Sequence, residues 1–123
     1  MPYVDGFVLP VPKRKIREYR QLARKAGRIW LEHGALEFRE CGGDDLSIKG
    51  IVPFTRLAKA KPNETVFFSW IVYKSKGHRD RVNKKVMSDP RMKMAPQSMP
   101  FDSKRMAYGG FQVVVDLKAR KRS

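Results

Sequence analysis

The sequence predicts an α+β fold: a ferredoxin-like subunit in the order β-α-β-β-α-β, with an antiparallel sheet and two helices on one of its faces. Apolar residues recur at helical spacing in two segments and alternate at strand spacing in four others. Several of these strands are apolar on both faces, which predicts that both faces of the sheet are covered. The length of 123 residues fits one domain, expected over residues 1–117, followed by a basic flexible tail over residues 118–123.

The first strand and the first helix are predicted by residues 3–34. Residues 3–11 are rich in Val, Phe and Tyr and end among prolines, which is typical of a strand. Between residues 13 and 33, one apolar stripe follows helical spacing: Ile16, Tyr19, Ala23, Ala26, Trp30 and His33. Gly34 is expected to end this helix as its C′ residue.

The middle of the chain predicts two further strands. Residues 35–45 alternate in polarity until the run "GGDD" breaks the pattern. Residues 47–63 are ambiguous, with a short strand expected at residues 54–58. Residues 65–74 form the clearest strand, because both of its faces are apolar and a strand of that kind is buried on both sides.

The last third of the chain predicts a helix and a strand. Ser75 is the candidate N-cap of a helix over residues 76–88. Residues 92–105 are expected to be irregular and residues 107–117 to form the last strand, where Gly109 and Gly110 indicate a bulge or a close backbone approach. Since the helices cover only one face of a sheet whose strands are apolar on both, we expect a second copy of the chain on the other face, as in a dimeric α+β barrel.

Composition indicates a cytoplasmic protein without a membrane span. The apolar run at residues 66–73 is too short to cross a bilayer, and the first residues lack the pattern of a signal peptide. Cys41 is the only cysteine, which fits a reducing compartment. The net charge of +15 comes mainly from the two expected helices and the tail.

Seven blocks of sequence carry a family resemblance, among them "YVDGFV" at residues 3–8, "AKAKPNETV-FSWI" at residues 58–71 and "MPFD-KRM-YGGF" at residues 99–111. The other blocks are "HGA", "EC-GDD", "SK--RD--N" and "DPRM", between residues 33 and 92. In these blocks the chain resembles the YbaA-like family of small bacterial proteins, a domain of unknown function. The resemblance implies a dimeric α+β barrel and no known reaction. Two features depart from the pattern of that family. Gly42 stands where the family often has an aromatic residue, and the composition is strongly basic.

The candidate catalytic residues are polar side chains expected beside a cleft between the sheet and the helices: Asp5, His33, Glu40, Arg105 and Tyr108. An acid–base pair, with Asp5 or Glu40 beside His33, would suit proton transfer in a cofactor-free enzyme. We expect no cofactor and no metal, because the two histidines lie in different elements and one cysteine cannot form a thiolate site.

Each candidate also has a structural interpretation. Asp5 lies between apolar strand positions, where a carboxylate is costly to bury unless it is paired, and Arg105 or Lys104 is its expected partner. His33 at a helix C-terminus would interact favourably with the helix dipole. Cys41 is expected to be a buried thiol that packs like an apolar side chain.

Nucleic-acid binding, to RNA in particular, is the alternative function. Basic helices and a basic tail form the electrostatic footprint of phosphate binding, with Arg17, Arg24 and Arg28 as the candidate residues. The RNP1 pattern of RNA-recognition motifs is absent, and the sheet aromatics would be buried in a dimer. We therefore rank a homodimer with a small-molecule cleft above RNA binding.

Overall fold

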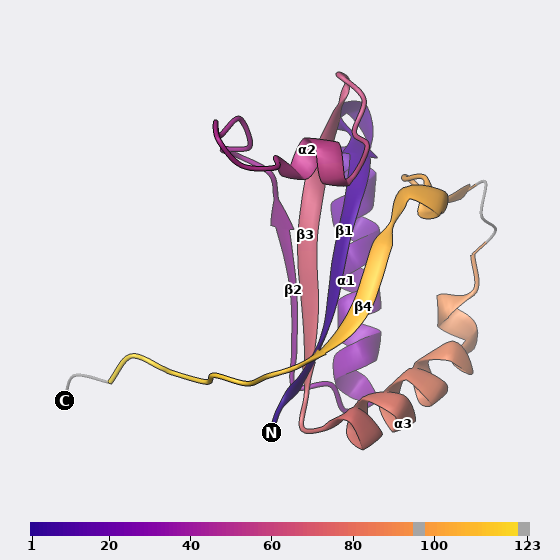
Figure 1. Cartoon of the computed structure of the whole chain (residues 1–123). Coiled ribbons are helices and arrows are strands. Elements are labelled where there is room, and N and C mark those ends of the chain that lie inside the picture. Colours follow the sequence, from indigo (N-terminus) through magenta and orange to yellow (C-terminus); the bar gives the residue numbers. More distant parts are fainter. Residues whose placement is uncertain (95–97, 121–123) are drawn as a thin grey trace.

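The computed structural model describes residues 1–94 and 98–120, and it shows an α+β fold with one four-stranded antiparallel sheet packed against helices (Figure 1). The strands are β1 (Tyr3–Pro12), β2 (Glu37–Gly42), β3 (Glu64–Tyr73) and β4 (Ala107–Gln112). The helices are α1 (Ile16–Glu32), the short α2 (Phe54–Leu57) and α3 (Lys76–Met87). Helices α1 and α3 pack on the same face of the sheet.

The sheet runs in the order β2-β3-β1-β4, so β1 and β3 form its centre. Each pair of neighbouring strands is antiparallel, and the register places Asp5 opposite Ile71 in β3 and opposite Gly110 in β4. A Cβ atom on Gly110 would collide with the ring of Tyr3. Gly110 therefore marks a close approach, and the β1–β4 register runs without a bulge.

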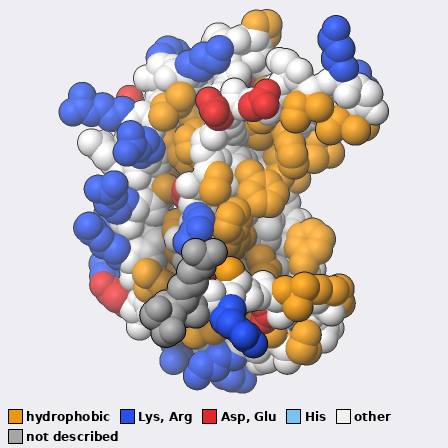
Figure 2. All heavy atoms as spheres, turned by 90° about the vertical axis from the view of Figure 1, so that its left-hand side faces the viewer, with side chains coloured by type: hydrophobic (Ala, Val, Ile, Leu, Met, Phe, Trp, Pro, Cys, Tyr) orange, Lys and Arg blue, Asp and Glu red, His pale blue; other side chains and the backbone are white. Residues whose placement is uncertain are grey.

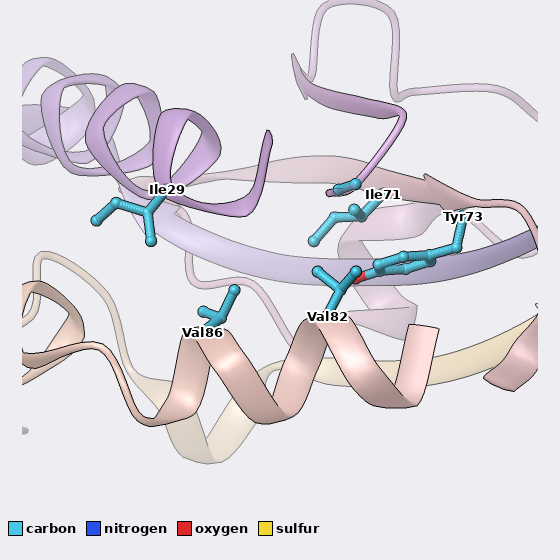
Figure 3. Packing of buried hydrophobic residues seen from close by; sticks show 6 residues of the cluster. Ile29, Ile71, Tyr73, Val82 and Val86 are labelled. Carbon is cyan, nitrogen blue, oxygen red and sulfur yellow. The ribbon is translucent and has the colours of Figure 1, made fainter. Parts of the chain in front are cut away.

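The core lies between the sheet and the two long helices. Ile29 of α1 and both Val82 and Val86 of α3 pack against Ile71 and Tyr73 of β3 (Figure 3). A second buried cluster joins α1 to β1 and β3: Leu9, Val11, Tyr19, Ala23 and Phe67. Because burying each large apolar side chain contributes about 1.5–3 kcal/mol, these clusters determine which face of the sheet the helices cover.

Local sequence sets the ends of both long helices. Gly34 follows α1 with a φ of 113°, a left-handed conformation that suits glycine, so the predicted C′ residue is confirmed. Ser75 caps α3, because its hydroxyl accepts a hydrogen bond from the backbone N–H of His78 at 3.1 Å. Inside α1, Gly27 allows close packing on β2, since a Cβ atom there would lie 2.6 Å from the ring of Phe38.

The second face of the sheet carries apolar side chains that remain solvent-accessible. We call it the open face; it is formed by the strand positions that alternate with the core residues, including Val4, Phe68, Trp70 and Phe111. Phe68 is 42% exposed and Phe111 is 63% exposed. Figure 2 shows hydrophobic side chains gathered on the right of the view and most Lys and Arg side chains along the left, the side towards which the 90° turn brings α1 from behind the sheet of Figure 1.

The last strand is shorter than expected: β4 ends at Gln112 instead of residue 117. Gln112 pairs with Tyr3, the first residue of β1, so the chain beyond it has no β1 backbone to pair with except one hydrogen bond from Val113 to the carbonyl of Pro2. The following residues extend away from the sheet (Figure 1) and include apolar side chains such as Leu117, which is 87% exposed.

Other differences concern short segments and boundaries. Residues 54–58 were expected to include a strand, but they contain α2, in which the N–H of Ala58 donates to the carbonyl of Phe54 at 2.9 Å. A short apolar run cannot be assigned to helix or strand by periodicity alone, which explains this wrong prediction. Strand β2 is shorter than residues 35–45, and a 3-10 turn at Lys13–Lys15 precedes α1.

Candidate functional site

A mostly apolar cavity of about 240 Å³ lies between the sheet and α1. Its sheet side includes Phe7, Leu9 and Ile71, and its walls include Trp30 of α1 and Phe38 of β2. Residues from 91–94 and 99–106 provide a further wall that contains four methionines. The cavity therefore has apolar side chains from three strands, one helix and one irregular segment around it.

Glu40 of β2 places a carboxyl group in the wall of this cavity. The Tyr19 hydroxyl of α1 donates a hydrogen bond to Glu40 Oε1 at 2.9 Å. Burial raises the pKa of Glu40, and hydrogen bonds from Tyr19 and Ser69 partly oppose this effect. Burial, followed by the nearby Glu40 charge, also raises the pKa of Tyr19, so its hydroxyl keeps its proton.

The raised pKa of Glu40 has a defined effect on stability. Its protonated form is favoured in the folded state, so its contribution to stability is fully present below the pKa of the unfolded chain. That contribution is lost as the pH rises through the higher pKa of the folded state. Chemically, a carboxyl group of this kind can release a proton to a ligand or accept one from it.

A larger open groove of about 860 Å³ adjoins the same pair of side chains, between α1 and β2. Tyr19 and Glu40 line both the cavity and the groove. Three exposed arginines of α1 also line the groove: Arg20, Arg24 and Arg28. The Tyr19–Glu40 pair therefore lies between an apolar cavity and a basic surface that water can reach.

Asp5 is buried and pairs with a residue of α3. Arg79 Nη1 donates to Asp5 Oδ1 at 2.8 Å, and Asn83 Nδ2 donates to Asp5 Oδ2 at 3.4 Å. The expectation that Arg105 or Lys104 pairs with Asp5 is wrong. Helix α3 begins shortly after the end of β3 that lies beside Asp5, whereas Arg105 precedes β4 at the opposite end of the sheet.

Asn83 and Arg79 connect Asp5 to neighbouring aromatic side chains. Trp30 Nε1 and the Tyr73 hydroxyl both donate to Asn83 Oδ1, each at 3.1 Å. Arg79 Nη1 also donates to the hydroxyl of Tyr108 at 2.8 Å. Burial, and then the Asp5 charge, raise the pKa of Tyr108. This network fixes α3 to α1, β1, β3 and β4, which is a structural role for two of the sequence candidates.

Arg105 forms a two-point contact with Glu64 at the start of β3. The Nη1–Oε1 and Nη2–Oε2 distances are both 2.7 Å, and Arg105 also binds Asp102 and the carbonyl of Lys59. Hydrogen bonding by Arg105 lowers the pKa of Glu64 to about 2. Because this pKa is lower than in the unfolded chain, the stabilisation is present above the unfolded pKa and is lost as the pH falls towards 2.

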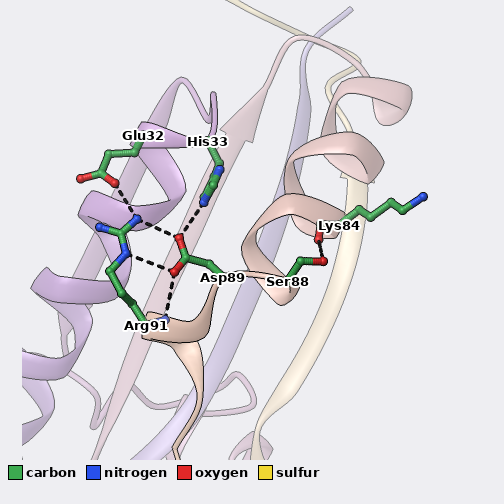
Figure 4. Close-up of polar contacts among 6 residues, drawn as sticks. All are labelled: Glu32, His33, Lys84, Ser88, Asp89 and Arg91. Carbon is green, nitrogen blue, oxygen red and sulfur yellow. Dashed lines mark hydrogen bonds and ion pairs between the residues drawn. The ribbon is translucent and has the colours of Figure 1, made fainter.

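His33 contacts the segment that follows α3. Its Nε2 atom lies 2.8 Å from Asp89 Oδ2, and Arg91 binds the same carboxylate (Figure 4). Hydrogen bonds from Arg91, and then from His33, hold the pKa of Asp89 well below its usual range. The expected acid–base pair is therefore wrong: His33 is beside Asp89 and not beside Asp5 or Glu40.

The remaining sequence candidates are more exposed. Cys41 lies opposite Phe68 in the β2–β3 pair and is half-buried, although the sequence predicts a buried thiol. Arg17, Arg24 and Arg28 are exposed on α1. In the described ranges, no group of three or more His, Cys, Asp or Glu side chains is arranged to hold a metal ion, and none of the helices is long and apolar enough to cross a membrane.

Two important residues were missed by sequence reasoning, Tyr19 and Arg79. Tyr19 belongs to the apolar stripe of α1, and the sequence contains no sign of a partner for its hydroxyl. Arg79 had a usable signal, because it is three and four residues before Val82 and Asn83 on the inward-facing side of α3. A polar residue on the buried stripe of a helix requires a partner.

The fold and the site define a small α+β protein with an apolar cavity between its sheet and its helices. Residues 2–103 match a family described as "Protein of unknown function (DUF1428)". Over 116 residues the chain is 51% identical to "Uncharacterized protein YbaA" of Escherichia coli K12, a match that covers 94% of this chain and 99% of that protein. The protein of the same name from Shigella flexneri matches equally. The chain belongs to this family of unknown function, which confirms the resemblance.

A solved structure is similar in fold. An uncharacterized NIPSNAP domain protein from Burkholderia xenovorans superimposes with a TM-score of 0.59 and 13% sequence identity, covering 95% of this chain and 99% of that one. At this identity, the likeness concerns the fold alone. It agrees with the α+β class predicted from the sequence.

Proposed function

We propose that the protein binds a small, mostly apolar molecule in the cavity between the sheet and α1, and that Glu40 exchanges a proton with this molecule. The observation that carries the proposal is the Glu40 carboxyl, which lines a mostly apolar cavity and accepts a hydrogen bond from Tyr19 at 2.9 Å. Apolar cavities with a few polar groups are typical ligand sites. A partly buried carboxyl with a raised pKa is suited to acid–base work without a cofactor.

We further propose that the protein is a homodimer in which two open faces pack together. The strand order β2-β3-β1-β4, with both long helices on the other face, supports a ferredoxin-like subunit of a dimeric α+β barrel. A second copy would cover Phe68, Trp70 and Phe111, which otherwise leave a large apolar surface in water.

The cavity proposal predicts saturable binding of a neutral apolar probe. By isothermal titration calorimetry, 1-octanol is expected to bind one site per chain with a Kd on the order of 1 mM. Ala26 lines the cavity, so Ala26→Leu should weaken binding and Ala26→Phe should weaken it further, by about tenfold or more, because each larger side chain fills more of the space.

Circular dichroism and thermal unfolding of both Ala26 variants would show that they remain folded. Graded loss of octanol binding in folded variants supports the cavity as the site. Absence of saturable binding to the wild type, or equal binding by all three proteins, would contradict the proposed function.

A second candidate function, RNA binding, is favoured by a separate observation. Arg17, Arg24 and Arg28 are all exposed on α1, on the side of the molecule where Lys and Arg predominate (Figure 2). If this face binds RNA, the triple variant R17Q/R24Q/R28Q should bind single-stranded RNA about tenfold or more weakly in fluorescence anisotropy at 150 mM salt, roughly physiological ionic strength.

The control for this experiment removes an equal number of charges from another helix. Lys76, Lys84 and Lys85 are exposed on α3, and their replacement by Gln should leave RNA binding nearly unchanged. Equal losses in the two triple variants, or no binding by the wild type at this salt concentration, would reject RNA binding as a function. Any remaining attraction to RNA would then be nonspecific electrostatics.

A further inference from the structure

We infer that the ligand of the cavity is an amphipathic anion, with its apolar body inside the cavity and a carboxylate or similar group held by Lys25 and Lys93 at the opening. The inference rests on the proposed small-molecule function and names the class of ligand. A volume of about 240 Å³ equals that of about eight water molecules at ~30 Å³ each, which suits an apolar body on the order of eight carbon atoms.

The charges at the opening of the cavity carry this inference. Lys25 of α1 and Lys93, in the segment after α3, both line the cavity and are exposed, which places them where it opens. Neither forms an ion pair with another residue of the described ranges. Arg91, another basic lining residue, is bound to Asp89 and Glu32. Two ammonium groups therefore remain available to an anion.

The rest of the site is compatible with an anionic ligand. Net charge of +15 and the basic surface of α1 attract anions towards this side of the molecule. Glu40 is the carboxyl in the wall, and burial raises its pKa, which favours the neutral form and reduces repulsion of an anion. A cationic ligand would instead have to pass the positive charges of Lys25 and Lys93. The described residues offer it no negatively charged partner at the opening.

One wall of the cavity consists largely of flexible, unbranched side chains. Four of the six methionines of the protein line it: Met92, Met94, Met99 and Met106. Methionine adapts its shape to its neighbours and is common at binding surfaces that accept several ligands. We therefore expect the cavity to tolerate different apolar shapes and to select its ligand by the charged group.

Calorimetric titration of the full chain with three eight-carbon probes tests the inference: octanoate, 1-octanol and octyltrimethylammonium. At pH 7.5 and low salt, octanoate should bind about fivefold more tightly than octanol, as expected from two exposed ion pairs, and the cation most weakly. The branched isomer 2-propylpentanoate should bind within about threefold of octanoate. High salt should reduce the preference for octanoate.

Variants at the opening separate the specific effect from that of net charge. The double variant K25Q/K93Q should bind octanoate no more tightly than octanol, with octanol binding unchanged. The double variant K76Q/K84Q removes two exposed lysines from α3 and should keep the full preference.

The possible failures are distinguishable. If none of the probes binds, the proposed function fails, and this inference fails with it. If octanol binds but octanoate is not preferred, or if K25Q/K93Q retains the preference, the cavity remains a binding site and only the assignment of an amphipathic anion is overturned.

Discussion

Replacing Arg79 by methionine is expected to lower the free energy of unfolding by about 3–5 kcal/mol. Asp5 is 1% exposed, and Arg79 lies 2.8 Å from its carboxylate. Without the guanidinium, the Asp5 carboxylate would lose its 2.8 Å charged partner and keep the longer contact to Asn83 in a buried site. Urea denaturation at fixed protein concentration would measure the effect, since self-association contributes to apparent stability.

Two further variants make this result specific. Arg81→Met removes an exposed arginine from the same helix, and it should change stability by no more than about 0.5 kcal/mol. The double variant D5N/R79M removes the buried charge together with its partner, so it should recover part of the stability lost in Arg79→Met. If Arg79→Met costs no more than Arg81→Met, the buried ion pair does not stabilise the fold as described.

Replacing Phe68 by glutamate is expected to convert the proposed homodimer to a monomer. Phe68 lies on the open face and packs against Trp70 with a ring separation of 5.5 Å. In a two-fold symmetric interface the substitution introduces a carboxylate twice, and burying an unpaired charge costs several kcal/mol. Dimer affinity should therefore fall about 100-fold or more in sedimentation velocity at micromolar concentration.

The matched control places the same charge on another part of the molecule. Leu31 of α1 is 46% exposed, close to the 42% of Phe68, but it lies on the helical side. Leu31→Glu should therefore leave the dimer intact. A wild-type protein that sediments as a monomer would contradict the homodimer, and equal effects of Phe68→Glu and Leu31→Glu would contradict the assignment of the interface to the open face.

Long elements with a clear period could be predicted from the sequence. Strands β1 and β3 and helices α1 and α3 each contain enough residues to show alternation or a stripe, so their positions were predicted to within a few residues. The end of β4 was not predictable in the same way, because it depends on where its partner β1 begins. The strand predicted at residues 54–58 was wrong, because a short apolar segment fits both the helical and the strand period.

The partners of polar side chains were harder to predict than the elements. Asp5 was predictable as a buried carboxylate that needs a cation, since it interrupts an apolar strand. Choosing Arg79 over Arg105 requires the strand register and the direction in which α3 returns across the sheet, and neither is visible in a local pattern. Glu40 was among the candidates, but its contact with Tyr19 and the cavity beside it arise only when α1 packs on β2.

The two tryptophans of the chain lie on opposite sides of the sheet. Trp30 lines the cavity and donates to Asn83, whereas Trp70 lies on the open face and donates to Glu37 at 3.1 Å. Each proposed event, ligand entry and pairing of two chains, would therefore alter the surroundings of a different indole. With single Trp→Phe variants, the intrinsic fluorescence of the unlabelled protein could follow the two events separately, and would show whether one of them changes the other.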